Sequence, residues 1–130
     1  MHLSIASNQW TLDLKGLRTN WEKEYLTEAP WLILVFRQAY FPLEDGKRRN
    51  HYYNEISTAI ATGLLLAAVQ NAGLVALTST PMNCGPALRN LLGRGQHEKL
   101  MTLLPVGYPR KDATVPDFGR KPLEEIMVVV

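Results

Sequence analysis

Apolar positions along the chain fall into short periodic blocks that proline and glycine separate. Residues 13–26 carry large apolar side chains at steps of three and four with charged side chains between them, which predicts an amphipathic helix. Pro30 follows this block, as expected after a helix. Residues 31–36 are an uninterrupted apolar run, too short for a helix, and predict a central strand covered on both faces.

The middle of the chain predicts a loop, a helix and a second strand. Residues 41–51 combine proline, Asp-Gly and basic residues, the composition of a loop. Residues 54–72 follow a helical period and are apolar on most sides, which predicts a buried helix that ends at Gly73. Residues 74–77 predict another covered strand, and residues 78–81 a polar turn that leaves it.

The last third of the chain is divided into shorter elements. Residues 86–92 predict a short helix, residues 97–103 a second helix, and residues 106–108 a brief strand. Residues 122–127 predict a helical turn that begins at a proline, where that residue is tolerated. Residues 128–130 are a β-branched stub, which favours contact with a partner surface or continuation as a strand.

Composition predicts one domain with a packed core. The chain has 130 residues, of which 46% are hydrophobic and 20% charged. The net charge of +2 and the lack of a basic stripe argue against nucleic acid as a partner. The longest apolar stretch, residues 59–69, is too short for a membrane helix, so we expect a soluble chain. The single Cys84 cannot form an internal disulfide, and the histidines lack the spacing of a metal site.

Three groups of residues are candidates for chemistry. Thr78, Ser79 and Thr80 place hydroxyl groups at the carboxyl end of a predicted strand, where open sheets often bind ligands. Arg120 could supply a cation to a phosphate beside the helical turn at Pro122, and Lys23 lies between two glutamates in a predicted helix. From the pattern alone an ordinary turn and solvated basic residues are the better interpretations, because such residues are common in loops and on surfaces.

Six blocks of sequence occur in an order typical of one family: residues 17–26 (LRTNWEKEYL), 51–57 (HYYNEIS), 70–75 (QNAGLV), 80–86 (TPMNCGP), 104–109 (LPVGYP) and 120–123 (RKPL). With them the chain resembles the carboxyl-terminal half of the iodotyrosine deiodinase family, within the FMN-dependent nitroreductase superfamily. The resemblance covers residues 10–130, which we expect to be the carboxyl-terminal part of a nitroreductase-like domain. Residues 1–9 stand outside it as an unmatched amino-terminal extension.

This resemblance implies a fold and an activity. The fold would be α+β, a nitroreductase-like mixed sheet flanked by helices, assembled as an intertwined homodimer with FMN at the subunit interface. The complete enzyme would remove iodide reductively from mono- and diiodotyrosine, releasing tyrosine, with NADPH as the source of electrons. Neither metal nor nucleic acid would take part.

The resemblance also implies roles for individual residues. Thr78, Ser79 and Thr80 would line the flavin, and the hydroxyl of Thr80 would act in catalysis through a hydrogen bond to flavin N5. Arg120 would hold the FMN phosphate. Lys23 would bind the carboxylate of the halogenated tyrosine from a helix that closes over the flavin.

Parts of the family pattern do not occur in this sequence. Further phosphate-binding residues, a substrate-binding glutamate and tyrosine, and an amino-terminal membrane anchor precede the aligned region in the family. We therefore expect a chain truncated on its amino-terminal side. Two alternatives stay open: a general FMN nitroreductase that reduces nitroaromatics or quinones, and a catalytically incompetent chain that does not hold flavin alone.

Overall fold

The chain folds into two compact units. The computed structural model describes Leu12, Leu14, Gly16, Leu17 and residues 22–130. The larger unit, Lys23–Pro109, contains the sheet, whereas the smaller unit combines Met1–Glu22 with Arg110–Val130.

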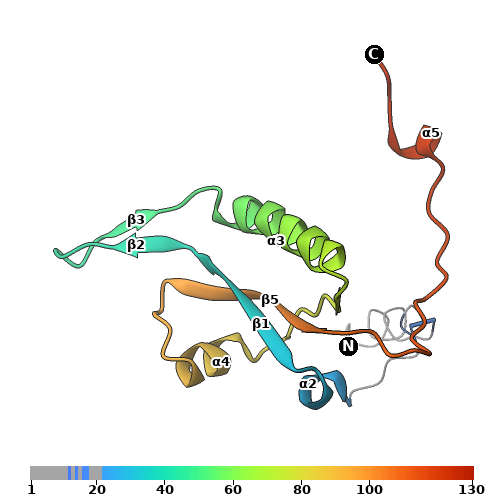
Figure 1. The fold of residues 1–130 in the computed structure, drawn as a ribbon. Coiled ribbons are helices and arrows are strands. Elements are labelled where there is room, and N and C mark those ends of the chain that lie inside the picture. Colours follow the sequence, from blue (N-terminus) through green and yellow to red (C-terminus); the bar gives the residue numbers. More distant parts are fainter. Residues whose placement is uncertain (1–11, 13, 15, 18–21) are drawn as a thin grey trace, which may run out of the picture. The chain divides into compact units, whose positions relative to one another are not determined.

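A three-stranded sheet organises the larger unit (Figure 1). Its order is β1 (Trp31–Gln38), β5 (Glu98–Gly107) and β4 (Val75–Ala76), with β5 in the centre. β1 pairs with β5 from Trp31↔Val106 to Gln38↔Glu98, and the register shifts at Val35/Phe36. Every pairing between described strands is antiparallel, so the parallel pairing expected of a mixed sheet is not found among them.

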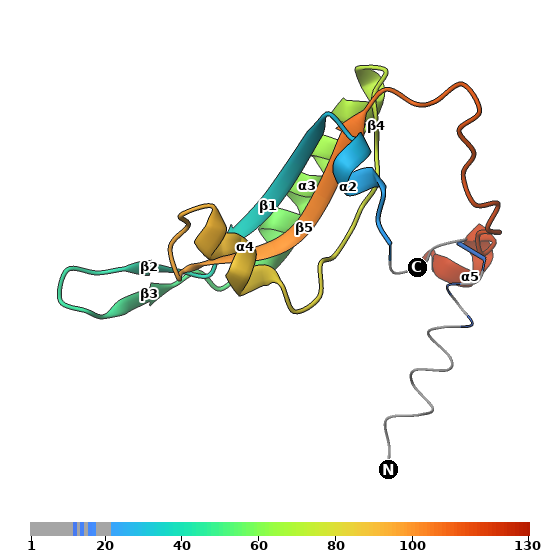
Figure 2. The same cartoon turned by 90° about the horizontal axis from the view of Figure 1, so that it is seen from below.

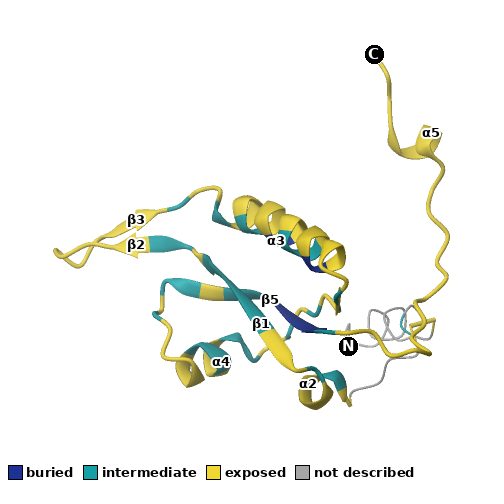
Figure 3. Cartoon of the chain, in the orientation of Figure 1, coloured by how far each residue is buried: buried dark blue, intermediate teal, exposed yellow. Residues whose placement is uncertain are grey.

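Helices lie on both faces of this sheet. Helix α3 (Asn54–Asn71) lies along one face, and α4 (Gly85–Leu91) and α2 (Tyr25–Glu28) lie on the other (Figures 1 and 2). The core forms where Val69 of α3 meets Leu104 and Val106 of β5. Burial is concentrated on β5 and on one side of α3 (Figure 3).

Glycine ends α3 as the sequence predicts. Gly73 has a φ of 75°, a left-handed conformation that glycine adopts without strain. Its N–H donates to the Gln70 carbonyl at 3.0 Å, and the Leu74 N–H donates to the Val69 carbonyl at 3.1 Å. These two bonds satisfy carbonyls that the helix end leaves open, and they turn the chain directly into β4.

Several predicted elements are confirmed. The structure contains the strand predicted over residues 31–36, the helices over 54–72 and 86–92, and the helical turn over 122–127, now α5 (Leu123–Ile126). The α+β class is confirmed as well. The strand predicted over 74–77 is shorter, with two residues in β4.

The helix predicted over residues 97–103 is wrong, because β5 occupies residues 98–107 as one strand. Leucine and methionine favour helix as isolated residues, but β1 offers a long pairing partner and five consecutive residues of β5 are buried. The loop predicted over 41–51 is a hairpin instead, formed by β2 (Tyr40–Pro42) and β3 (Arg48–Asn50).

Two further predictions are wrong: the place of β1 in the sheet and the burial of α3. β1 lies at an edge of the described sheet rather than at its centre. It is also less covered than predicted, because Trp31 and Leu32 are exposed and the rest of its apolar run is half-buried. α3 was predicted to be a buried helix, yet among its residues Thr62 and Val69 alone are buried and its outer side is exposed.

The continuous helix predicted over residues 13–26 is not found, although part of that range lies outside the described residues. Leu12 and Leu14 are helical, whereas Gly16 and Leu17 form a turn. Glu22 and Lys23 have no regular structure, and the single-turn α2 begins at Tyr25. Lys23 is therefore not in a helix.

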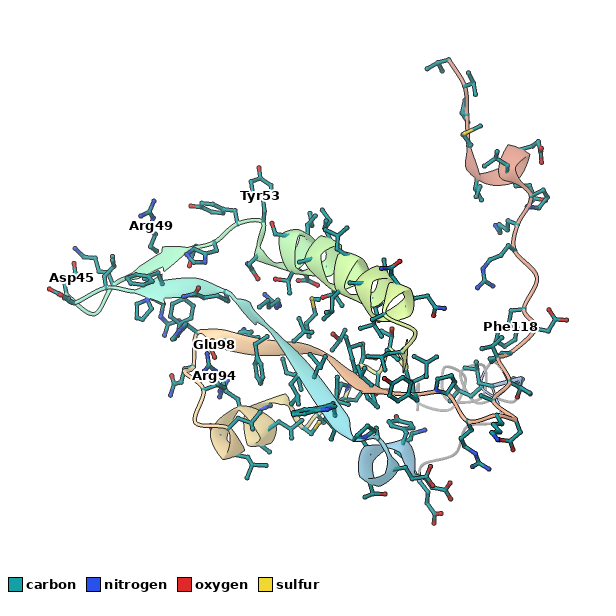
Figure 4. The ribbon with its side chains drawn as sticks, in the orientation of Figure 1. Asp45, Arg49, Tyr53, Arg94, Glu98 and Phe118 are labelled. Atoms are coloured by element: carbon teal, nitrogen blue, oxygen red, sulfur yellow. The ribbon has the colours of Figure 1, made fainter. Side chains whose placement is uncertain are left out.

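An ion pair anchors the start of β5. Arg94 contacts both carboxylate oxygens of Glu98, with Nε–Oε2 at 2.5 Å and Nη2–Oε1 at 2.6 Å (Figure 4). His97 adds an edge contact to Tyr40 at 5.9 Å between ring centroids, and Arg48 stacks on the same tyrosine at 4.6 Å. The turn before β5 and the β2–β3 hairpin are thus joined by charged and aromatic side chains.

The hydrogen bond from Arg94 lowers the pKa of Glu98 below its ordinary value, so the ion pair stabilises the folded chain above the unfolded pKa. That contribution is lost as the pH falls through the lowered pKa of the folded state. Urea unfolding at pH 7 and at pH 3 should show a larger acid-induced loss of stability for the parent chain than for Glu98→Gln. Equal losses in the two proteins would show that the pair contributes nothing to acid sensitivity.

Candidate functional site

Thr78, Ser79 and Thr80 continue the register of β4 along β5. Ser79 and Leu103 exchange both backbone bonds, with N···O distances of 3.0 and 2.8 Å. The register is the same as that of Val75↔Gly107, so the predicted polar turn is an extension of the edge strand. Thr78 and Thr80 are exposed, and Ser79 is half-buried.

Pro105 explains why this extension is not a regular strand. Leu77 stands opposite Pro105 in the register, and its N–H donates to the Pro105 carbonyl at 3.3 Å. Proline has no N–H, so it cannot return the bond to the Leu77 carbonyl. The pairing is thereby weakened immediately before the three hydroxyl residues, and it resumes at Ser79.

The hydroxyl residues form a row along the outer edge of the sheet. In an antiparallel strand, successive side chains point to opposite faces. Thr78 and Thr80 therefore share the face on which α3 lies, and Ser79 shares the opposite face with Leu103. Such an edge offers hydroxyl groups and unpaired backbone groups to a planar, polar ligand.

Arg120 belongs to the smaller unit and is exposed. Its Nη1 donates to the Phe118 carbonyl at 3.2 Å. The guanidinium therefore follows a local backbone turn and faces solvent, where it could meet an anion. α5, which follows, has four residues and adds no helix-terminal site.

Lys23 begins the larger unit and is half-buried. Its carbonyl accepts a hydrogen bond from the Leu26 N–H at 3.0 Å, which ties it to the first turn of α2. Lys23 and the hydroxyl residues belong to the same unit. The structure thus brings the three hydroxyl residues together along one strand edge, and Arg120 belongs to the other unit.

Two hollows in the larger unit lie away from the predicted residues. One of about 590 Å³ is lined by Leu34, Phe36, Gln38, Leu92, Arg94 and Glu98. The other, of about 330 Å³, lies where the hairpin leads into α3 and is lined by Gln38, His51, Tyr53, Asn54, Ser57 and Thr58. No group of histidine, cysteine, aspartate or glutamate suited to a metal occurs in the part of the chain that the structure describes.

Sequence reasoning missed Thr102. It lies on β5 with 8% of its surface exposed, and its Oγ1 has no hydrogen-bond partner among the described residues. The alternation of residues 102, 104 and 106 on one face would have revealed it, but the helical interpretation of residues 97–103 hid that signal. None of the described helices is long and apolar enough to cross a membrane.

Sequence comparison relates the chain to iodotyrosine deiodinases. It is 65% identical to human iodotyrosine deiodinase 1 over 129 residues, which are 99% of this chain and 45% of the human protein. It is 66% identical to the Hydra vulgaris iodotyrosine deiodinase over 120 residues, 92% of this chain and 44% of that protein. The chain thus spans about 45% of the length of these relatives. No family model matches the sequence.

The alignment with the human protein covers 99% of the chain, whereas the Hydra alignment covers 92%. A boundary at residue 10 therefore stays a prediction.

Solved structures share the fold. An oxidized iodotyrosine deiodinase, bound to FMN and 3-iodo-L-tyrosine, superposes with a TM-score of 0.71 at 28% identity, covering 94% of this chain and 56% of that one. A putative NADH dehydrogenase/NAD(P)H nitroreductase from Bacteroides thetaiotaomicron superposes with a TM-score of 0.62 at 18% identity, covering 90% and 64%. The chain is a partial-length homologue of the iodotyrosine deiodinases with a nitroreductase-like fold.

Proposed function

We propose that this chain forms part of an FMN-dependent enzyme that removes iodide reductively from mono- and diiodotyrosine. The observation that carries the proposal is its identity of about 65% to iodotyrosine deiodinases across nearly the whole chain. A similar structure holds FMN and 3-iodo-L-tyrosine together, which supports the same pair of ligands here.

Thr78, Ser79 and Thr80 form an edge of the sheet, here called the hydroxyl edge, that suits a flavin. Thr78 and Thr80 are exposed beside a weakened strand pairing, so their hydroxyls are accessible to the edge of a planar ring. We assign Thr80 as the catalytic hydroxyl that hydrogen-bonds flavin N5, with Thr78 and Ser79 beside it. When bound, FMN would supply the electrons for breaking the carbon–iodine bond.

Arg120 and Lys23 suit the anionic groups of the two ligands. The exposed guanidinium of Arg120 fits the FMN phosphate, because charge-assisted bonds to phosphate favour arginine. Lys23 fits the substrate carboxylate, because a compact ammonium in a partly desolvated site attracts that charge. NADPH is proposed as the source of electrons.

The exposed side of α3 supports a homodimer. Ile56, Ile60 and Leu64 recur at steps of four and expose 61%, 62% and 68% of their surfaces. An apolar stripe of this kind favours contact with a second copy of the chain. The flavin would then bind where the two copies meet.

The activity is tested by exchanging this chain for the matching 129 residues of the human relative. The proposal predicts that the chimera retains FMN and releases iodide from 3-iodotyrosine. A folded chimera without flavin, or one that reduces nitroaromatics but not iodotyrosine, would contradict it. The 130-residue chain by itself is expected to retain little or no FMN, since it spans less than half of its relatives, and flavin absorbance after dialysis measures this.

In the chimera, Arg120→Ala should weaken FMN binding by about 1.5–3 kcal/mol, the range for a charge-assisted hydrogen bond. Equilibrium dialysis measures the affinity. Arg110→Ala is a matched control, because Arg110 is an exposed arginine of the same unit that pairs with Asp112. If both variants retain FMN equally, Arg120 does not bind the phosphate.

Lys23→Ala should cost about 1.5–3 kcal/mol of iodotyrosine affinity in the chimera while FMN stays bound, because the substrate carboxylate loses its cation. Reduction of a nitroaromatic without a carboxylate should change little. The exposed Lys111 supplies a control substitution, Lys111→Ala. Equal losses with both substrates would assign Lys23 to folding or flavin binding, and no loss with either would make it a surface lysine.

A further inference from the structure

The larger of the two hollows is not used by the proposed site. Its volume of about 590 Å³ lies within the range of small-molecule sites, about 300–1,000 Å³. On β1, Ile33 and Val35 pack against the core beside α3, so the alternate residues face the other side of the sheet. The hollow lies on that other side, where it is lined by Leu34, Phe36, Gln38, Leu92, Arg94 and Glu98.

A β-bulge turns Glu98 into this hollow. The pairing of β1 with β5 shifts between Val35 and Phe36 and leaves Met101 without a partner on β1. Glu98 and Leu104 are an even number of residues apart, so in a regular strand both would face α3. The extra residue reverses the alternation, and Glu98 lines the hollow instead. Bulges that redirect a side chain in this way are frequent beside functional sites.

A glycine places Arg94 at the same end of the hollow. Gly93 follows α4 in a left-handed conformation with a φ of 63°, and the Arg94 N–H donates to the Arg89 carbonyl at 2.9 Å. Nε and Nη2 of Arg94 bind the two carboxylate oxygens of Glu98 (Figure 4), whereas Nη1 makes no bond within the described residues. The Arg94 side chain exposes 52% of its surface and that of Glu98 16%.

The ion pair offers both signs of charge beside an apolar floor. Nη1 of Arg94 can donate to a carboxylate, and Glu98 can accept two further hydrogen bonds, because a carboxylate has about four acceptor positions. The pair is neutral as a whole, so a ligand with a single charge would leave that charge unbalanced in a partly desolvated site. A ligand that carries one charge of each sign keeps the cluster neutral.

We propose that this hollow binds a free amino acid with a large apolar side chain. The carboxylate of the ligand accepts from Nη1 of Arg94, and its ammonium group donates to Glu98. Its side chain covers Phe36 and Leu92. The site lies apart from the hydroxyl edge, and the proposal does not depend on the proposed function.

L-Phenylalanine tests the proposal in the purified chain without flavin. In a carbon–proton NMR titration it should shift the methyl resonances of Leu34 and Leu92 and reach saturation. Hydrocinnamate lacks the ammonium group and phenethylamine lacks the carboxylate, so each should bind about tenfold more weakly or worse, because a charged hydrogen bond is lost. Equal affinity for the three compounds, or unchanged methyl resonances with L-phenylalanine, would overturn the proposal.

Two variants assign the charges. Arg94→Gln should bind L-phenylalanine no more tightly than phenethylamine, because the carboxylate has lost its cation. Glu98→Gln should bind it no more tightly than hydrocinnamate. Arg110→Gln is the matched control and should leave the affinity unchanged, because Arg110 is an exposed arginine of the other unit that pairs with Asp112.

Affinity for L-phenylalanine that is unchanged in both variants would contradict the assignment of the ion pair. Should either variant not fold, the comparison of the three compounds in the parent chain still decides the matter, because it requires no substitution.

Discussion

The packing of α3 against β5 is the interaction on which the rest of the larger unit depends. Leu104 is fully buried between Val69 and the flanking strands, and Val106 extends the same contact. This contact orients β5, and β5 in turn sets the register of β1 and β4. The position of Thr78, Ser79 and Thr80 therefore depends on the hydrophobic contact between α3 and β5.

The same helix carries an apolar surface that the described chain does not cover. The side of α3 that faces the sheet supplies Leu65, Leu66 and Val69, while the stripe of Ile56, Ile60 and Leu64 faces outward. Burying side chains of this size is worth about 1.5–3 kcal/mol each. A chain with such a surface gains stability by self-association, which is the physical basis of the proposed homodimer.

Local signals in the sequence were sufficient to predict α3, α4 and β1. A helical period of 18 residues with a terminal glycine admits few other structures, and an apolar run between prolines favours a strand. The pattern could not show which side of α3 meets the sheet, because that helix is apolar nearly all round. The strand predicted over residues 106–108 found the end of β5 alone, because the earlier residues of β5 favour a helix until β1 pairs with them.

The candidate site was predicted in part. The hydroxyl residues were found because they follow an apolar block, but their pairing with β5 depends on register, which no local signal reports. Thr102 was missed because residues 97–103 were interpreted as a helix. The role of Lys23 came from resemblance alone, whereas a weak basic signal in the sequence also pointed to Arg120, and the structure leaves both roles as proposals.

Sedimentation velocity of the purified chain tests most directly whether the outer side of α3 is an interface. The account predicts a dimer or larger species for the parent chain. Ile60→Lys combined with Leu64→Lys should give a monomer of unchanged helicity, whereas Ile126→Lys, at a similarly exposed isoleucine of α5, should leave the association intact. A parent chain that sediments as a monomer at the same concentration would contradict the account.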